Sequence, residues 1–154
     1  MGIWFDNKDF LPLVRYSFSL LERINKELSL AENLSVLRNI TLLGIRFDKK
    51  DNESILKALK DSTRASDAIF VFKDDSLALL LFGTDKEGAT HVINKLREFF
   101  GENMSYAMVT SPEDGEDAFS LIENFFYYSK RKLQRDGKTK AFFRYLRKAF
   151  FRYL

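Results

Sequence analysis

The spacing of hydrophobic residues predicts four helices, at residues 8–28, 51–62, 86–100 and 117–133. In each segment apolar side chains recur three and four positions apart, which places them on one face of a helix. Gly101 follows the third segment as a stop signal. The residues predicted to face the core are Phe10, Val14, Phe18, Leu21, Ile24, Leu28, Ile55, Leu56, Leu59, Val92, Leu96, Phe99, Phe100, Phe119, Ile122, Phe126 and Leu133.

Shorter apolar segments predict four strands, at residues 39–47, 68–72, 77–82 and 104–110. The second and third form a hairpin across a tight acidic turn. The central order is therefore strand, helix, hairpin, helix, strand, which is the split βαβ pattern of ferredoxin-like folds. We expect an α/β (α+β) domain with a mainly antiparallel sheet and the two central helices on one face.

Several short motifs, taken in order, resemble the GGDEF domain of diguanylate cyclases. Five residues separate RASD from KDDSL, the spacing that normally lies between the RxxD motif and the GGDEF signature of that family. The resemblance implies a nucleotidyl-cyclase-like fold over residues 1–137, followed by a basic extension at residues 138–154. The segments that carry it are DFLPLVRYSF (9–18), IRFDKK (45–50), RASD (64–67), KDDSL (73–77) and SPEDGEDAFSLIENFFYYSK (111–130).

The signature itself departs from the family at the positions that catalysis requires. In the family, two carboxylates on adjacent strands hold two magnesium ions that position a nucleoside triphosphate. Here Arg46 stands in place of the first carboxylate, and a guanidinium stays protonated and repels divalent cations. We therefore expect no catalytic residue, no metal and no cofactor. The degenerate signature consists of Lys73, Asp74, Asp75, Ser76 (in place of the glutamate) and Leu77.

Arg64 and Asp67 match the RxxD motif residue for residue. In the family this motif binds the product, cyclic di-GMP, through the planar fork of the arginine. The resemblance therefore implies a cyclic di-GMP site at Arg64 and Asp67. The alternative is an arginine in solvent after a helix and an aspartate that caps a turn before a strand.

The C-terminal extension differs from the rest of the chain in charge. Residues 130–154 hold ten Lys or Arg and one acid, or +9, and since the formal net charge is +3, the remaining residues sum to −6. Drawn as a helix, the extension has one basic and one aromatic face, as interfacial helices do. Its expected contacts are a homodimer or the domain itself, a protein partner, or an anionic membrane surface, while the acidic body disfavours nucleic acid. The residues expected to interact are Phe142, Arg144, Arg147 and Phe150.

The composition excludes several classes of site. The chain has no cysteine, which excludes disulfides and thiolate chemistry, and its one histidine, His91, cannot build a histidine-rich metal site. No apolar run has bilayer-spanning length, and the first residues do not resemble a secretion signal. We expect a cytoplasmic protein, peripheral at the inner membrane face if the extension binds lipid.

Three functions remain open. The first is a catalytically inactive GGDEF-like signalling module that binds cyclic di-GMP and acts through a partner or self-association. The second is a nucleotide-independent dimerisation or interaction scaffold whose Phe- and Arg-rich extension contacts a partner or a membrane surface. The third is an enzyme of altered chemistry built on Asp48, Asp74 and Asp75.

Overall fold

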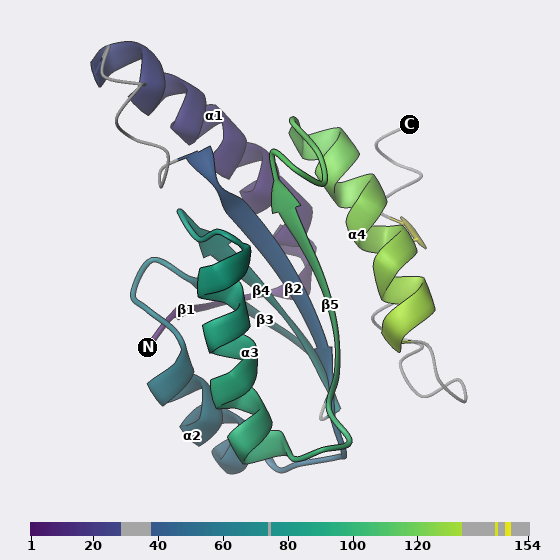
Figure 1. The fold of residues 1–154 in the computed structure, drawn as a ribbon. Coiled ribbons are helices and arrows are strands. Elements are labelled where there is room, and N and C mark those ends of the chain that lie inside the picture. Colours follow the sequence, from purple (N-terminus) through teal and green to yellow (C-terminus); the bar gives the residue numbers. More distant parts are fainter. Residues whose placement is uncertain (29–37, 74, 134–143, 145–146, 149–154) are drawn as a thin grey trace.

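The computed structural model describes residues 1–28, 38–73, 75–133, 144, 147 and 148. These residues form one five-stranded sheet in the order β1-β3-β4-β2-β5 (Figure 1). The β2, β3, β4 and β5 strands pair antiparallel with one another, as the ferredoxin-like pattern predicts. The strands are β1 (Ile3–Phe5), β2 (Ile40–Arg46), β3 (Ala68–Lys73), β4 (Ser76–Phe82) and β5 (Ser105–Ser111).

Helices cover both faces of the sheet. The central helices α2 and α3 share one hydrophobic core with one face, as expected, and α1 and α4 share a second core with the other. The molecule therefore has three layers, with the sheet in the middle (Figure 1). The helices are α1 (Phe10–Leu28), preceded by the 3-10 turn η1 (Asn7–Asp9), then α2 (Asn52–Ser62), α3 (Lys86–Phe100) and α4 (Ala118–Leu133).

The β2 strand shows why the sequence folds this way. Leu42 packs into the core under α1 and α4, whereas Leu43 and Ile45 pack under α2 and α3. A strand that is covered on both faces is apolar at successive positions rather than at alternating ones. Gly44 lies between them on the α4 side, where a Cβ atom would come within 3.0 Å of the Leu133 side chain and 3.2 Å of the Phe125 ring.

The N-terminal strand β1 was not predicted, because three residues are too short to show a period. It pairs parallel with β3, with Ile3 opposite Ala68. Two hydrogen bonds fix it beyond this pairing: the Gly2 N–H donates to Thr63 Oγ1 at 2.8 Å, and the Ile3 N–H donates to the Asp67 carbonyl at 2.8 Å.

Three predictions of buried helix residues were wrong. Leu56 is 43% exposed, Phe99 40% and Phe119 38%. The other predicted core residues of these helices include several that are buried. The apolar residues buried on the same helices are Ile55, Ala58, Leu59, Ala89, Ile93, Leu96, Phe100, Leu121, Ile122, Phe125 and Leu133. Small residues such as Ala58 and Ala89 lie at the contact, and a pattern of large apolar residues does not detect them.

The helix ends follow local chemistry. The Asp85 carboxylate caps α3 by accepting the Gly88 N–H at 2.9 Å, and Gly101, at φ 86°, ends that helix as predicted.

None of the helices within the described ranges has both the length and the apolar content that a bilayer crossing requires. Of the C-terminal extension, Arg144 and Arg147 are described and exposed, whereas Phe142 and Phe150 lie outside the described residues.

Candidate functional site

Residues 64–67, the Arg64 turn, connect the end of α2 to β3. The turn is closed by the Asp67 N–H, which donates to the Arg64 carbonyl at 3.0 Å, and by Asp67 Oδ2, which accepts the Arg64 N–H at 2.8 Å. An aspartate that bonds the backbone in this way stabilises a tight turn. The sequence RASD therefore folds into a local unit in which Asp67 fixes the backbone of Arg64.

Asp67 is only 1% exposed. Burial raises the pKa of its carboxyl above the ordinary value of 3.8, while the backbone hydrogen bond from Arg64 and the charge of Arg64 act in the opposite direction. Its Oδ1 atom makes no hydrogen bond and lies 3.8 Å from Arg64 Nη2. The Asp67 carbonyl is the acceptor of the Ile3 N–H, so β1 closes over the turn.

The Arg64 side chain is held at one edge and open at the other. Arg64 Nη2 donates to Thr84 Oγ1 and, at 3.4 Å, to the Phe82 carbonyl at the end of β4. The side chain is nevertheless 62% exposed. Its remaining N–H donors are therefore available to a planar acceptor such as a phosphate or a nucleobase edge.

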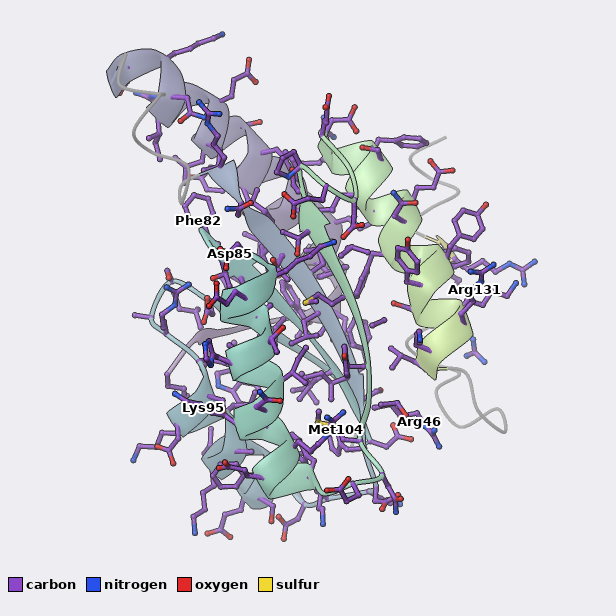
Figure 2. The ribbon with its side chains drawn as sticks, in the orientation of Figure 1. Arg46, Phe82, Asp85, Lys95, Met104 and Arg131 are labelled. Carbon is purple, nitrogen blue, oxygen red and sulfur yellow. The ribbon has the colours of Figure 1, made fainter. Side chains whose placement is uncertain are left out.

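Arg64 opens into a groove of about 270 Å³, the Arg64 groove, between this turn and α3. Two cations line it, Arg64 and Lys95, together with His91. His91 is exposed on α3 and lies four residues before Lys95, so both side chains share one helix face. Figure 2 shows Lys95 farther along the helix from Asp85, whose carboxylate is occupied by the cap of α3.

The degenerate signature lies at the opposite end of β4. Arg46, at the end of β2, stands opposite Ser76 on β4 and Ser105 on β5. The Phe47 N–H donates to the Asp75 carbonyl at 2.9 Å, which fixes the turn to the end of β2. Leu77 is fully buried. Figure 2 shows Arg46 and Asp85 at opposite ends of the sheet. Asp74 and the side chain of Lys73 lie outside the described residues.

Three buried polar atoms at the degenerate signature have no hydrogen-bond partner among the described residues: Arg46 Nε, Asp75 Oδ1 and Ser76 Oγ. Within the described part of the chain, no three His, Asp or Glu side chains are grouped to hold a metal ion. Asp48 instead accepts a hydrogen bond from Asn103 Nδ2 at 3.1 Å. The polar groups here form neither a network nor a carboxylate cluster.

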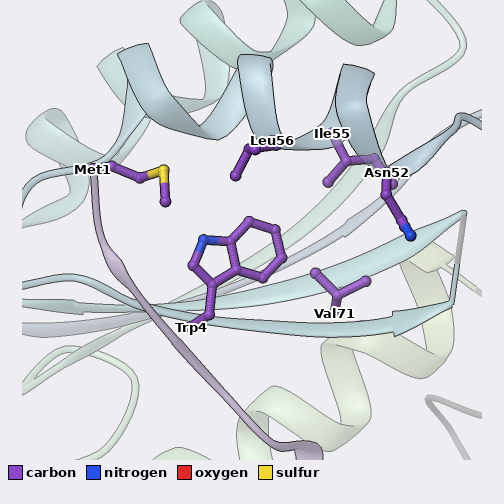
Figure 3. Close-up of a pocket in the computed structure, with 6 residues that line it drawn as sticks. All are labelled: Met1, Trp4, Asn52, Ile55, Leu56 and Val71. Carbon is purple, nitrogen blue, oxygen red and sulfur yellow. The ribbon is translucent and has the colours of Figure 1, made fainter.

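A further pocket of about 380 Å³ lies between β1 and α2 (Figure 3). The Trp4 indole forms its floor, with Leu56 from α2 and Val71 from β3 on its walls. The described residues that line it include no charged side chain. The sequence did not predict this pocket, because β1, which carries Trp4, was not predicted.

Sequence reasoning named Arg64 and Asp67 as candidates, and it did not predict Thr84 and Lys95, which line the same groove. Thr84 reaches Arg64 only because the hairpin returns the end of β4 to the Arg64 turn. The signal available for Lys95 was its position four residues after His91 on a predicted helix.

No protein-family model matches the sequence, and no curated protein matches it significantly. Solved structures do match. The GGDEF domain of a Pseudomonas aeruginosa protein, TpbB or YfiN, is 11% identical with a TM-score of 0.55, over 82% of this chain and 84% of that chain. A sensory box/GGDEF family protein from Caulobacter crescentus is 14% identical with a TM-score of 0.51, over 77% and 88%.

A third match is a DGC protein from Thermotoga maritima, 23% identical with a TM-score of 0.47, over 74% of this chain and 92% of that chain. The Pseudomonas and Caulobacter structures show that this chain has the fold of GGDEF domains, as the motifs in its sequence predict. Because a fold hosts many functions, what this chain does must be inferred from its own residues.

Proposed function

We propose that this chain is a non-catalytic signalling module of GGDEF fold that binds cyclic di-GMP in the Arg64 groove. Binding is passed on through a partner protein or through self-association. One observation carries the proposal: a buried aspartate fixes the backbone of an arginine whose guanidinium opens into a groove that also holds Lys95.

The chemistry of the ligand fits this groove. Cyclic di-GMP carries two phosphate charges and two guanine edges, and a forked guanidinium binds either kind of acceptor with two parallel hydrogen bonds. Lys95 supplies a second positive charge. Since Asp67 is buried and bonded to the Arg64 backbone, its role is to position Arg64 rather than to face solvent.

The residues at the degenerate signature support the absence of catalysis. A pair of magnesium ions needs several carboxylate oxygens, and the described residues offer Asp75 beside a guanidinium and a hydroxyl. Arg46 stands directly opposite Ser76, so a guanidinium side chain occupies the strand position where the resemblance implies a metal-binding carboxylate. These residues do not fit a two-metal site.

Calorimetric titration of cyclic di-GMP into the full chain tests the binding half of the proposal. We expect saturable heat with the unchanged protein, none with Arg64→Ala, and unchanged binding with Arg131→Ala, which removes an exposed arginine from α4. Equal binding by all three proteins would place the ligand elsewhere. No heat in any of them would favour the alternative function, a nucleotide-independent scaffold.

Incubation with GTP and magnesium tests the catalytic half. We expect no cyclic di-GMP by liquid chromatography at any protein concentration. Formation of cyclic di-GMP at a rate that Asp75→Ala abolishes would show that the signature is active, and would do so independently of the titration.

A further inference from the structure

In the described part of the chain, the β5 strand forms one edge of the sheet and pairs with β2 alone. A groove of about 420 Å³, the β5 groove, runs along its open side. Its walls come from α3 on one face of the sheet and α4 on the other, through Arg97, Tyr128 and Lys132. Tyr106 and Met108 of β5 lie along its floor.

The backbone of β5 presents hydrogen-bonding groups to this groove. The Thr110 N–H donates to Asp114 Oδ2 at 2.9 Å and its carbonyl accepts the Asp114 N–H at 2.7 Å, so both Thr110 groups point away from β2. In an antiparallel pair such groups alternate along the strand, so those of Tyr106 and Met108 point the same way. None of the backbone hydrogen bonds of turns, loops and caps in the described residues involves either residue.

The charge around the β5 groove has one sign. Among the residues that the structure describes, two cations line it, Arg97 and Lys132, and no carboxylate does. The Arg97 guanidinium carbon lies 5.8 Å from the centroid of the Tyr106 ring, which holds the cation above the strand. Tyr106 and Tyr128 are 37% and 40% exposed and offer apolar contact beside the charges.

We propose that the β5 groove binds an extended acidic segment of a partner protein, which adds to the sheet as a sixth strand. The backbone groups of Tyr106 and Met108 supply the hydrogen bonds, and Arg97 and Lys132 select acidic side chains. The basic extension of this chain is a poor occupant, because residues 138–154 contain no acid. A second copy is also disfavoured, because it brings the same two cations to the contact.

The probe is a short synthetic peptide of alternating glutamate and valine, with a lysine and valine peptide as control. We expect the acidic peptide alone to bind the full chain. Bound peptide should slow amide hydrogen exchange at Tyr106 and Met108 and leave Ala107 and Val109 unchanged, because the latter two already bond to β2.

Two variants separate charge from backbone. Arg97→Glu with Lys132→Glu should weaken acidic-peptide binding by about tenfold or more, while Lys57→Glu, an exposed site on α2, should not. Met108→Pro removes the N–H that faces the groove and leaves the β2 hydrogen bonds in place, so it should abolish binding, whereas Met108→Ala should retain it. Circular dichroism checks that each variant is folded.

Several outcomes would overturn the proposal. Equal binding of the lysine peptide would remove the charge selection, and binding that survives Met108→Pro in a folded protein would remove the added strand. If sedimentation shows a dimer of the unliganded chain that Met108→Pro dissociates, the occupant is a second copy rather than an acidic partner.

Discussion

The Arg64 turn and the degenerate signature lie at opposite ends of β4 and differ in how their polar groups are satisfied. At the Arg64 turn the arginine is bonded through both its backbone and its guanidinium. Asp67 Oδ1 is buried there without a hydrogen bond, but it lies 3.8 Å from Arg64 Nη2. At the signature, Arg46 Nε, Asp75 Oδ1 and Ser76 Oγ are buried without partners. Polar groups held in place by the fold bind a ligand without first being ordered. The comparison therefore locates the preorganised chemistry of this chain at the Arg64 turn.

The largest expected effect is at Arg64. Arg64→Ala should abolish measurable binding of cyclic di-GMP, and Arg64→Lys, which keeps the charge but loses the fork, should weaken it by about tenfold or more. Lys95→Ala should weaken binding less than either, because it removes one charge and leaves the fork. Calorimetry measures all three, and a lysine variant that binds as well as the unchanged chain would show that charge alone suffices.

A pair of conservative substitutions tests the difference in hydrogen bonding between the two regions directly. Ser76→Ala should raise the free energy of unfolding by about 1 kcal/mol, because it removes a buried hydroxyl that has no partner. Thr84→Val should lower it by about 1 kcal/mol, because Thr84 Oγ1 accepts from Arg64. Urea unfolding measures both.

Ser129→Ala is the matched control, since Ser129 Oγ is also buried without a partner, and it should act like Ser76→Ala. A decrease in the free energy of unfolding on Ser76→Ala would show that the Ser76 hydroxyl makes a stabilising hydrogen bond.

The pH dependence of stability should separate Asp67 from an exposed capping aspartate. Since the folded-state pKa of Asp67 is raised, the folded chain binds more protons, and the free energy of unfolding falls as pH rises from 3.8 through the folded pKa. Asp67→Asn should remove this decrease in urea unfolding followed against pH.

Asp117 should behave in the opposite way, because hydrogen bonds from Ser120 lower its pKa. Its contribution to the free energy of unfolding is present above its unfolded pKa and is lost as pH falls through the folded pKa. Asp117→Asn should therefore reduce the loss of stability at acidic pH. Equal pH profiles for the two variants would contradict the burial of Asp67.

The smallest effect should come from Asp75→Ala. If the signature takes no part in ligand binding, this variant should bind cyclic di-GMP within about twofold of the unchanged chain, well inside the tenfold change that about 1.4 kcal/mol produces. A tenfold loss in calorimetry would mean that the two ends of β4 act together.

Local pattern predicted most of the fold. The hairpin, the four helices and the stop at Gly101 follow from periodicity and chain-reversal signals, and the structure confirms them. The strand β1 and the exact buried faces of α2 and α3 could not be predicted. They depend on contacts between distant segments, such as Ile3 with Asp67, and on small residues such as Ala58 that mark close packing only once the helices are placed.

The candidate site divides in the same way. Arg64 and Asp67 form a local turn, so their sequence spacing was enough to bring them together. Thr84 and Lys95 reach the same groove through the return of β4 and the packing of α3, which no local spacing encodes. The unpartnered atoms at Arg46, Asp75 and Ser76 likewise depend on the register of β2 against β4.

The absence of a side chain at Gly44 affects the position of α4, and through it the β5 edge of the sheet. Because α4 rests on β2 through Phe125 and Leu133 at this glycine, the helix lies as deep as a bare backbone permits. The same helix carries Tyr128 and Lys132 into the wall of the β5 groove. Gly44 thus sets the distance between α4 and β2. A bulkier residue there would move one wall of that groove outward without changing any residue that lines it.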